Sequence, residues 1–292
     1  MPAARTRVAA VSALGMLAAG SLTVVTATTA DASAATTVRV SITATHVVRM
    51  PTHLRPGVLK YKVGSAKPGS FQILRPKPGY TKREFSHDVR LGLSRNQVDV
   101  KALKHLERNL TLLGGVNSKP GQPGVMWAQL RSGTYWVIDT MPAVPRPSKT
   151  LTVHVGGASV GGTLPGGPTF RAVDEAKWAP RPASIPRSGV LRFRNQSTDN
   201  HFVTTGKLLP GKTVADFKAW VDKTKSGQDA GPPPFDQKAP GIDSGVVSPG
   251  HAMALRYSVP AGNYVLLCFW PDAEHGGMPH AFMGMYRALT VR

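Results

Sequence analysis

The sequence is poor in cysteine and in acidic side chains. Its single cysteine, Cys268, excludes an internal disulfide, so the fold must be held by packing and hydrogen bonds alone. Sixteen acidic residues stand against 36 lysines and arginines, and the formal net charge is +20. Zinc-protease spacing of the H-E-x-x-H type does not occur. We therefore expect a basic protein that is not an enzyme.

Residues 1–34 have the composition of a signal peptide. Arg5 and Arg7 give a charged start, an apolar or small-residue stretch follows, and Ala30-Asp-Ala32 and Ala32-Ser-Ala34 each fit a cleavage site. No twin-arginine pair is present, which favours ordinary Sec export. Later stretches fall short of the roughly 18 apolar residues that a membrane span needs. We expect a secreted, extracytoplasmic protein without a transmembrane segment in its mature chain.

The pattern of the remaining chain indicates β-structure. Thirty glycines and 25 prolines punctuate short runs rich in Val, Thr, Tyr and Phe. An all-β fold is therefore predicted, with a helical insertion in each half. In the first half the predicted strands are 38–44, 57–63, 70–74, 125–130, 133–139 and 150–155, and the predicted helix is 94–113; in the second half the helix is 214–224.

Sequence segments of the first half recur in the second half in the same order. Gly57-Val-Leu-Lys-Tyr-Lys matches Gly189-Val-Leu-Arg-Phe-Arg, and Gly133-Thr-Tyr-Trp-Val matches Gly262-Asn-Tyr-Val-Leu. Such matches predict two copies of one β-domain. The predicted organisation is a signal peptide at 1–34, a first domain at 35–156, a linker at 157–183 and a second domain at 184–292.

Residues that could bind a soft metal ion occur only in the second copy. The alignment of the two copies places Ser70 opposite His201 and Asp139 opposite Cys268. Thiolate, thioether and imidazole together form a ligand set that copper favours. An unpaired thiol outside the cell is exposed to oxidation unless it is buried or bound to metal. Cys268 is therefore the first candidate ligand.

The second copy resembles the cupredoxins, the blue-copper family of small Greek-key β-sandwiches. In that family one histidine comes from an early strand, and a cysteine, a histidine and a methionine come from the last loop. The matching positions are His201, Cys268, His280 and Met285. The resemblance covers residues 184–292 with ligands and residues 38–156 as a copy without them. It implies a type 1 copper site and one-electron transfer.

The sequence departs from compact cupredoxins in the length of its metal loop. Eleven residues, 269–279, separate Cys268 from His280, where the family has only a few. The insert brings an alternative histidine, and the loop also offers a second methionine. His275 could replace His280, and Met283 could replace Met285 as the axial ligand.

Two further functions remain compatible with the sequence. A metal-free secreted binding module could use the basic surface to bind anionic cell-envelope polymers or an acidic partner protein. A copper chaperone could use the methionine-rich loop for extracytoplasmic copper handling. Electron transfer instead requires a redox partner protein. Nucleic acid is not an expected partner, because the chain carries no recognisable nucleic-acid-binding motif.

Overall fold

Alternation of apolar and polar side chains explains the strands. In β1 (Thr36–Ile42), Val38, Val40 and Ile42 are buried while their neighbours are exposed, the period of two expected of a half-buried strand. The computed structural model describes residues 35–94, 97–142 and 144–292, so the predicted signal peptide lies outside the described residues. Strands make up 43% and helices 16% of the structure, which confirms the predicted all-β sandwich class.

Five of the six strands predicted in the first half agree closely with the structure, and the sixth, β1, is shifted by two residues. Short strands and β6 were not predicted. The strands of this half are β1, β2 (Val48–Arg49), β3 (His53–Leu54), β4 (Gly57–Ser65), β5 (Gly69–Pro76), β6 (Leu110–Ser118), β7 (Gly124–Leu130), β8 (Gly133–Asp139) and β9 (Leu151–Val155), and a short 3-10 helix, η1, covers Pro147–Lys149.

The second half contains most of the same succession. Its elements are β10 (Thr169–Val173), β11 (Lys177–Trp178), β12 (Ser184–Ile185), β13 (Ser188–Asn195), β14 (Thr204–Leu208), α3 (Val214–Lys225), β15 (Phe235–Asp236), β16 (Ala252–Ser258), β17 (Gly262–Leu267), β18 (Pro271–Asp272), β19 (Met278–Pro279), η2 (His280–Met283) and β20 (Tyr286–Val291). The predicted helix at 214–224 is present as α3.

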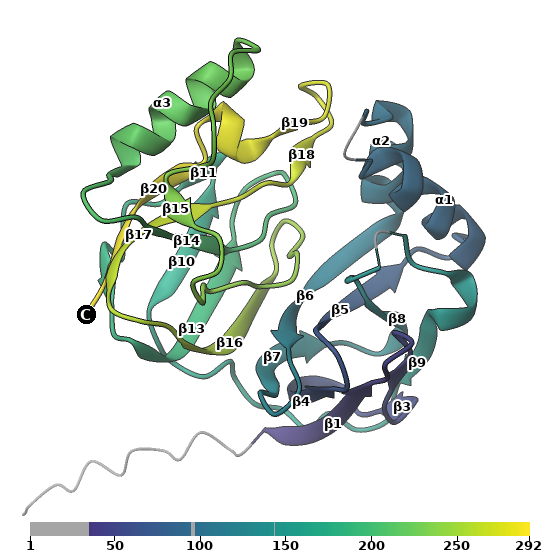
Figure 1. The fold of residues 1–292 in the computed structure, drawn as a ribbon. Coiled ribbons are helices and arrows are strands. Elements are labelled where there is room, and N and C mark those ends of the chain that lie inside the picture. The colour runs from purple at the N-terminus through teal and green to yellow at the C-terminus, as the bar shows by residue number, and fades with distance from the viewer. Residues whose placement is uncertain (1–34, 95–96, 143) are drawn as a thin grey trace, which may run out of the picture. The chain divides into compact units, whose positions relative to one another are not determined.

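The strands pair in the same way in both halves (Figure 1). β1 lies parallel to β4, as β10 lies parallel to β13, and β5–β8–β9 pair as β14–β17–β20 do. Each half has its own five-stranded sheet, β3-β9-β8-β5-β6 or β12-β20-β17-β14-β15. One eight-stranded sheet, β11-β10-β13-β16-β7-β4-β1-β2, runs through both halves because β7 pairs with β16.

The predicted linker is only partly a linker. Residues 156–167 hold no strand, but β10 and β11 lie within the predicted span of 157–183, where β10 pairs with β11 on one side and with β13 on the other. Phe170, Ala172 and Trp178 are buried there, so this segment belongs to the core of the second half. Contacts group the described residues of both halves into one unit. The domain boundaries therefore remain a prediction.

The helical prediction for residues 94–113 is wrong in extent. Within the described part of this span only Val100–Asn109 form a helix, α2, and Leu110–Ser118 continue as β6. A second helix, α1 (Lys82–Gly92), was not predicted. It begins at a capping box in which Thr81 and Glu84 bond to each other's backbone N–H groups. That Thr-x-x-Glu signal was present in the sequence.

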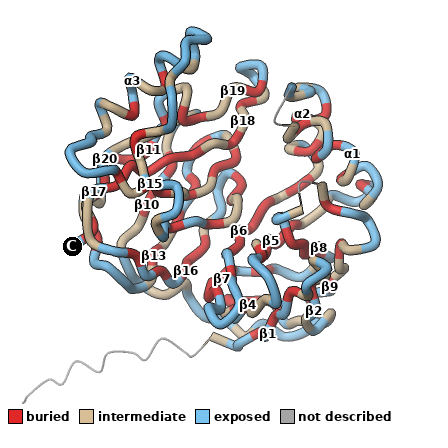
Figure 2. The backbone as a smooth tube through the Cα atoms, viewed as in Figure 1, coloured by how far each residue is buried: buried red, intermediate tan, exposed pale blue. Residues whose placement is uncertain are grey.

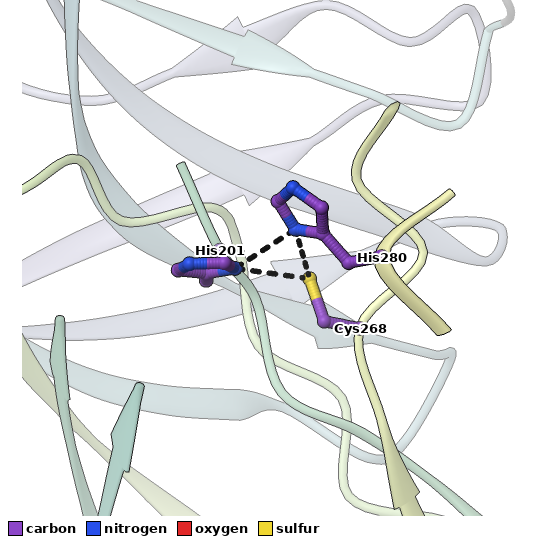
Figure 3. A group of neighbouring side chains, drawn as sticks. All are labelled: His201, Cys268 and His280. Carbon is purple, nitrogen blue, oxygen red and sulfur yellow. Dashed lines mark hydrogen bonds between the residues drawn. The ribbon is translucent and has the colours of Figure 1, made fainter. Parts of the chain in front are cut away.

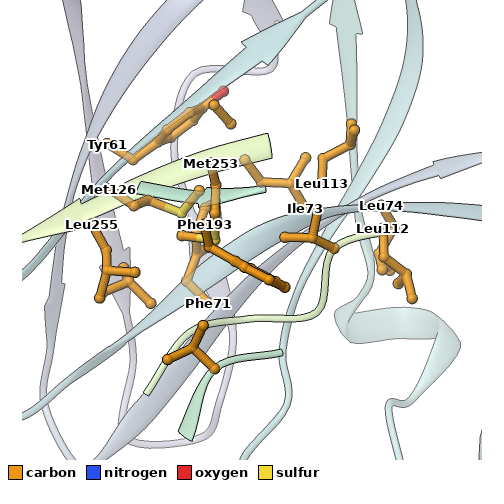
Figure 4. Packing of buried hydrophobic residues seen from close by; sticks show 14 of the residues in the cluster. Tyr61, Phe71, Ile73, Leu74, Leu112, Leu113, Met126, Phe193, Met253 and Leu255 are labelled. Carbon is orange, nitrogen blue, oxygen red and sulfur yellow. The ribbon is translucent and has the colours of Figure 1, made fainter. Parts of the chain in front are cut away.

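One hydrophobic core serves both halves. Phe71, Ile73 and Met126 of the first half are in the same buried cluster as Phe193 and Met253 of the second (Figure 4). The burial map shows the fully buried residues concentrated along the strands, with exposed residues at the loops and on the outer faces of the helices (Figure 2). A smaller cluster around Phe217 lies beneath α3. Together the two clusters fix β14 and β17, next to which two of the candidate metal ligands lie.

Candidate metal centre

Three candidate ligands come together from three different segments. His201 precedes β14 and is held by two backbone hydrogen bonds with Val247, of 3.1 and 2.8 Å. Cys268 follows directly on the last residue of β17. His280 opens η2, and its backbone N–H donates to the Trp270 carbonyl oxygen at 2.9 Å. The backbone of all three segments is therefore anchored close to the ligand itself.

The donor atoms of the three side chains form a small triangle (Figure 3). The two imidazole Nδ1 atoms of His201 and His280 are 3.0 Å apart, and the Cys268 Sγ lies 3.6 and 3.7 Å from them. Metal bonds to imidazole nitrogen and thiolate sulfur are about 2.0–2.3 Å long, which places the ligands of one ion roughly 3–4 Å apart. The triangle therefore has the size of a three-coordinate metal site.

Burial makes all three side chains neutral in the absence of metal. Each is 0% exposed. Burial raises the pKa of the Cys268 thiol to about 12. Burial lowers the pKa of His280 to about 4, and burial together with the neighbouring His280 lowers that of His201 to about 3. A metal cation must then displace the thiol proton on binding, as thiolate ligation requires.

The insert between Cys268 and His280 is a β-hairpin. β18 and β19 pair antiparallel, and the Asp272 Oδ1 accepts hydrogen bonds from the backbone N–H groups of Glu274 and His275 at 2.7 and 2.8 Å in the turn. The hairpin brings the chain back to its starting point, where the Ala281 N–H donates to the Cys268 carbonyl at 2.7 Å. Cys268 and His280 therefore lie close together in space although eleven residues separate them in the sequence.

The two methionines and two histidines of the loop lie in different surroundings. Met285 is 0% exposed, and its N–H donates to the His280 carbonyl at 2.9 Å. Met283 is only half-buried. His275 is half-exposed, and its Nδ1 faces the Asp272 carboxylate at 3.0 Å rather than the other ligands. The structure therefore places Met285 and His280, and not their alternatives, with the buried group.

The hydrogen bonding of Nε2 in His201 and His280 shows whether these rings are held by other protein groups or are available to a metal. Nε2 of His201 and Nε2 of His280 are buried and have no hydrogen-bond partner among the described residues. Both rings instead point Nδ1 at the thiol. Three neutral donors that converge in a buried volume match the donor set of a type 1 site, two imidazoles and one thiolate. The residues present fit copper.

The same positions in the first half form no such group. Asp139 there is buried and accepts hydrogen bonds from the Ser70 N–H at 2.8 Å and from the Met141 N–H at 3.0 Å. Its other oxygen lies 2.7 Å from Nδ1 of His46. A hydrogen-bonded Asp139 thus occupies the position that Cys268 has in the second half. The first half keeps the same strands but has no soft metal ligand at this position.

Helix α2 of the first half contacts the metal loop, which the sequence did not predict. The Trp270 Nε1–H donates to Glu107 Oε1 at 2.7 Å, and Asn200 donates to the same oxygen at 3.4 Å. Lys104 and Glu274 form an ion pair at 2.9 Å. Glu107 thus joins the neighbour of His201 to the residue two positions after Cys268. No spacing in the sequence signals a contact of such long range.

One sequence motif suggests a hydrolase but lacks the required surroundings. Residues 157–161, Gly-Ala-Ser-Val-Gly, match the G-x-S-x-G pattern, which needs a strand-to-helix turn. Here β9 precedes the motif, and no helix follows before β10. The Ser159 hydroxyl donates to the Pro56 carbonyl at 3.2 Å, which occupies it in a loop contact. The motif is structural.

Comparisons with known proteins give structural neighbours only. No family model and no curated protein matches the chain. A reduced auracyanin from Roseiflexus castenholzii is 22% identical and covers 42% of this chain and 94% of its own, with a TM-score of 0.27. An azurin from Methylomonas sp. strain J is 14% identical over 42% of this chain and 95% of its own, with a TM-score of 0.27. A copper-containing nitrite reductase from Thermus scotoductus is 9% identical over 88% of this chain and 67% of its own, with a TM-score of 0.23.

The donor set and its geometry determine which kind of site this is. Two imidazole Nδ1 atoms and one thiol sulfur converge in a buried triangle, and a buried methionine follows the second histidine. The group of His201, Cys268, His280 and Met285 therefore fits a type 1 copper site.

Proposed function

We propose that the protein binds one copper ion through His201, Cys268 and His280, with Met285 as a weak axial ligand, and that it carries single electrons. The observation that supports this most directly is the buried triangle of Nδ1, Nδ1 and Sγ with edges of 3.0, 3.6 and 3.7 Å. A trigonal His2Cys set with a distant methionine is the donor arrangement of blue-copper electron-transfer sites.

Copper in such a site supplies a reversible one-electron couple. The protein residues hold the donor atoms in place and exclude water. The three ligand segments are fixed by backbone hydrogen bonds to Val247, Trp270 and Cys268 itself. Trp178 packs near the His201 ring, with centroids 6.5 Å apart, and is itself buried. Fixed donors in a dry site limit the rearrangement that accompanies a change of charge.

The four ligands leave no open position at this centre. Catalytic metal sites keep a position for water or substrate, whereas closed sites do not. This supports a carrier rather than an enzyme. We propose an extracytoplasmic location on the basis of the signal-like residues 1–34. Because the chain has a net charge of +20, we also propose that its redox partner has an acidic docking face. None of the helices among the described residues is long and apolar enough to cross a membrane.

Titration with Cu(II) tests this function. Wild-type protein should retain one copper ion and develop an intense visible band from the thiolate–copper bond. The band should be lost in Cys268→Ser and in His280→Ala, while His275→Ala, the matched variant in the same loop, should keep it. Circular dichroism confirms that each variant is folded. A colourless wild-type protein that retains no copper would contradict the proposal, and binding of Cu(I) alone without colour would favour a copper chaperone.

A second function has one observation in its favour. Arg171, Arg181 and Arg292, together with three hydroxyl side chains, surround a groove of about 560 Å³. Guanidinium groups bind phosphate and carboxylate through paired hydrogen bonds, so this groove suits an anionic polymer. Retention on a polyphosphate matrix should fall with salt and in the Arg171→Ala variant. If Arg171→Ala is retained as strongly as wild type, the affinity for the matrix comes from the overall positive charge and not from this groove.

A further inference from the structure

Acidic residues gather beside the candidate copper centre in a chain that is otherwise basic. Glu107, Glu175, Asp199, Asp272 and Glu274 are close enough for their charges to influence one another. Asp199 is half-buried, and Asp272 has only 3% of its side chain exposed. Among the described residues, the basic side chains that face this group are Lys104 at Glu274, and His275 and His280 at Asp272.

No ion pair to Glu107, Glu175 or Asp199 occurs among the described residues. Burial raises the pKa of Glu107 to about 7, with Asp199 and Asp272 adding to the effect. A divalent cation bound among these carboxylates would offset the charge repulsion that remains between them.

An independent observation points to a ligand at the same place. The His280 side chain is 0% exposed, and its Nε2 has no hydrogen-bond partner among the described residues. This nitrogen faces the Asp272 Oδ2 at 3.7 Å, too far for a direct hydrogen bond. Donor atoms of Asp199, Asp272 and His280 all lie within 4.8 Å of one another. A buried, unpartnered nitrogen thus faces the Asp272 carboxylate, and the Asp199 carboxylate belongs to the same group.

We propose that Asp199, Asp272 and Nε2 of His280 form a second metal site, which binds a divalent cation of the zinc type. Two carboxylates match the charge of such an ion, and imidazole is a good zinc ligand. The Asp272 Oδ1 already accepts two backbone hydrogen bonds, which orient the free Oδ2 toward the site. Three protein ligands leave at least one position open, unlike the neighbouring centre.

The site shares one imidazole with the candidate copper centre but does not depend on copper. When a metal ion occupies Nδ1, the neutral ring carries its proton on Nε2. The second cation replaces that proton, which passes to the solvent, and the imidazolate then joins the two metals. In the absence of copper the ring proton can stay on Nδ1, and Nε2 binds the cation as a neutral donor.

Zinc binding to copper-loaded protein tests the proposal. After dialysis against Zn(II), elemental mass spectrometry should find one zinc ion per chain in addition to the copper ion. Asp199→Asn and Asp272→Asn should each weaken zinc binding by more than the roughly 10- to 100-fold that loss of an outer-shell partner causes. Asp222→Asn, which removes an exposed carboxylate on α3, is the matched control and should bind zinc as wild type does.

Asp199→Asn should disturb the fold least, because no hydrogen bond to the Asp199 carboxylate occurs among the described residues. Asp272→Asn keeps an Oδ1 atom that can accept the two backbone hydrogen bonds. Absence of added zinc in wild type, or equal zinc in wild type and both asparagine variants, would overturn the second site. The visible copper band is recorded on the same samples. A band without zinc refutes this site alone. If the protein binds zinc in a way that depends on Asp199 but shows no visible copper band, only the copper proposal is refuted.

Discussion

Glu107 connects the half without metal ligands to the metal loop, so its replacement is informative. Glu107→Gln keeps an oxygen that can accept the hydrogen bond from Trp270 Nε1, now 2.7 Å long, but removes the carboxylate charge. The carboxylate is partly buried near Asp199 and Asp272. Removing its charge should therefore stabilise the folded protein wherever Glu107 is ionised.

The size and sign of the effect follow from the pKa. Burial raises the pKa of Glu107 from its ordinary 4.5 to about 7. Because the folded pKa lies above the unfolded one, the contribution of Glu107 to stability is complete below pH 4.5 and is lost as the pH rises through 7. At about 1.4 kcal/mol per pH unit, and with solvent at one side of the carboxylate, we expect a loss of about 1–3 kcal/mol.

Urea denaturation at several pH values measures this contribution. The difference in unfolding free energy between Glu107→Gln and wild type should increase by about 1–3 kcal/mol in favour of the variant between pH 5 and pH 8.5. Asp236→Asn, on an exposed part of β15, controls for the loss of one carboxylate as such. Parallel pH profiles for Glu107→Gln and wild type would refute the reasoning.

Met285→Leu should raise the reduction potential of bound copper, since it removes the axial donor, and Met283→Leu should leave the potential unchanged; spectroelectrochemistry compares the two. Thr81→Ala removes the hydroxyl of the α1 capping box and should lower the free energy of unfolding by about 1 kcal/mol in a urea titration. Gly277→Ala should lower the thermal midpoint and speed copper loss on dialysis, because Gly277 has a φ of +81° and a Cβ there would lie 2.5 Å from the Val98 Cβ. Unchanged values in either structural variant would show that the capping box or the contact with Val98 does not limit stability.

Local patterns in the sequence predicted most of the strands of the first half, whereas the resemblance to the cupredoxins implied the candidate ligands, three of which converge. Alternation in β4 and β8 and the glycines that start them were sufficient, because both signals act over a few residues. The comparison of the two halves also separated framework from ligands, since Asp139 occupies in one half the position that Cys268 has in the other.

Features that depend on long-range contact were missed. Residues 110–113 have helical spacing, yet they extend as β6, because pairing with β5 outweighs local preference. β10 lies in a segment predicted as linker and becomes a strand by pairing with β13. The roles of Glu107, Asp199 and Asp272 arise only when the two halves and the hairpin meet. No single stretch of sequence contains that information.

X-ray absorption at the copper edge tests the central claim most directly, because it counts the ligands of the bound ion. The account predicts two nitrogen ligands at about 2.0 Å and one sulfur at about 2.3 Å in wild-type protein, with the short sulfur contribution absent from Cys268→Ser. A shell of only nitrogen and oxygen in wild type would contradict it, as would a short sulfur contribution that survives in Cys268→Ser.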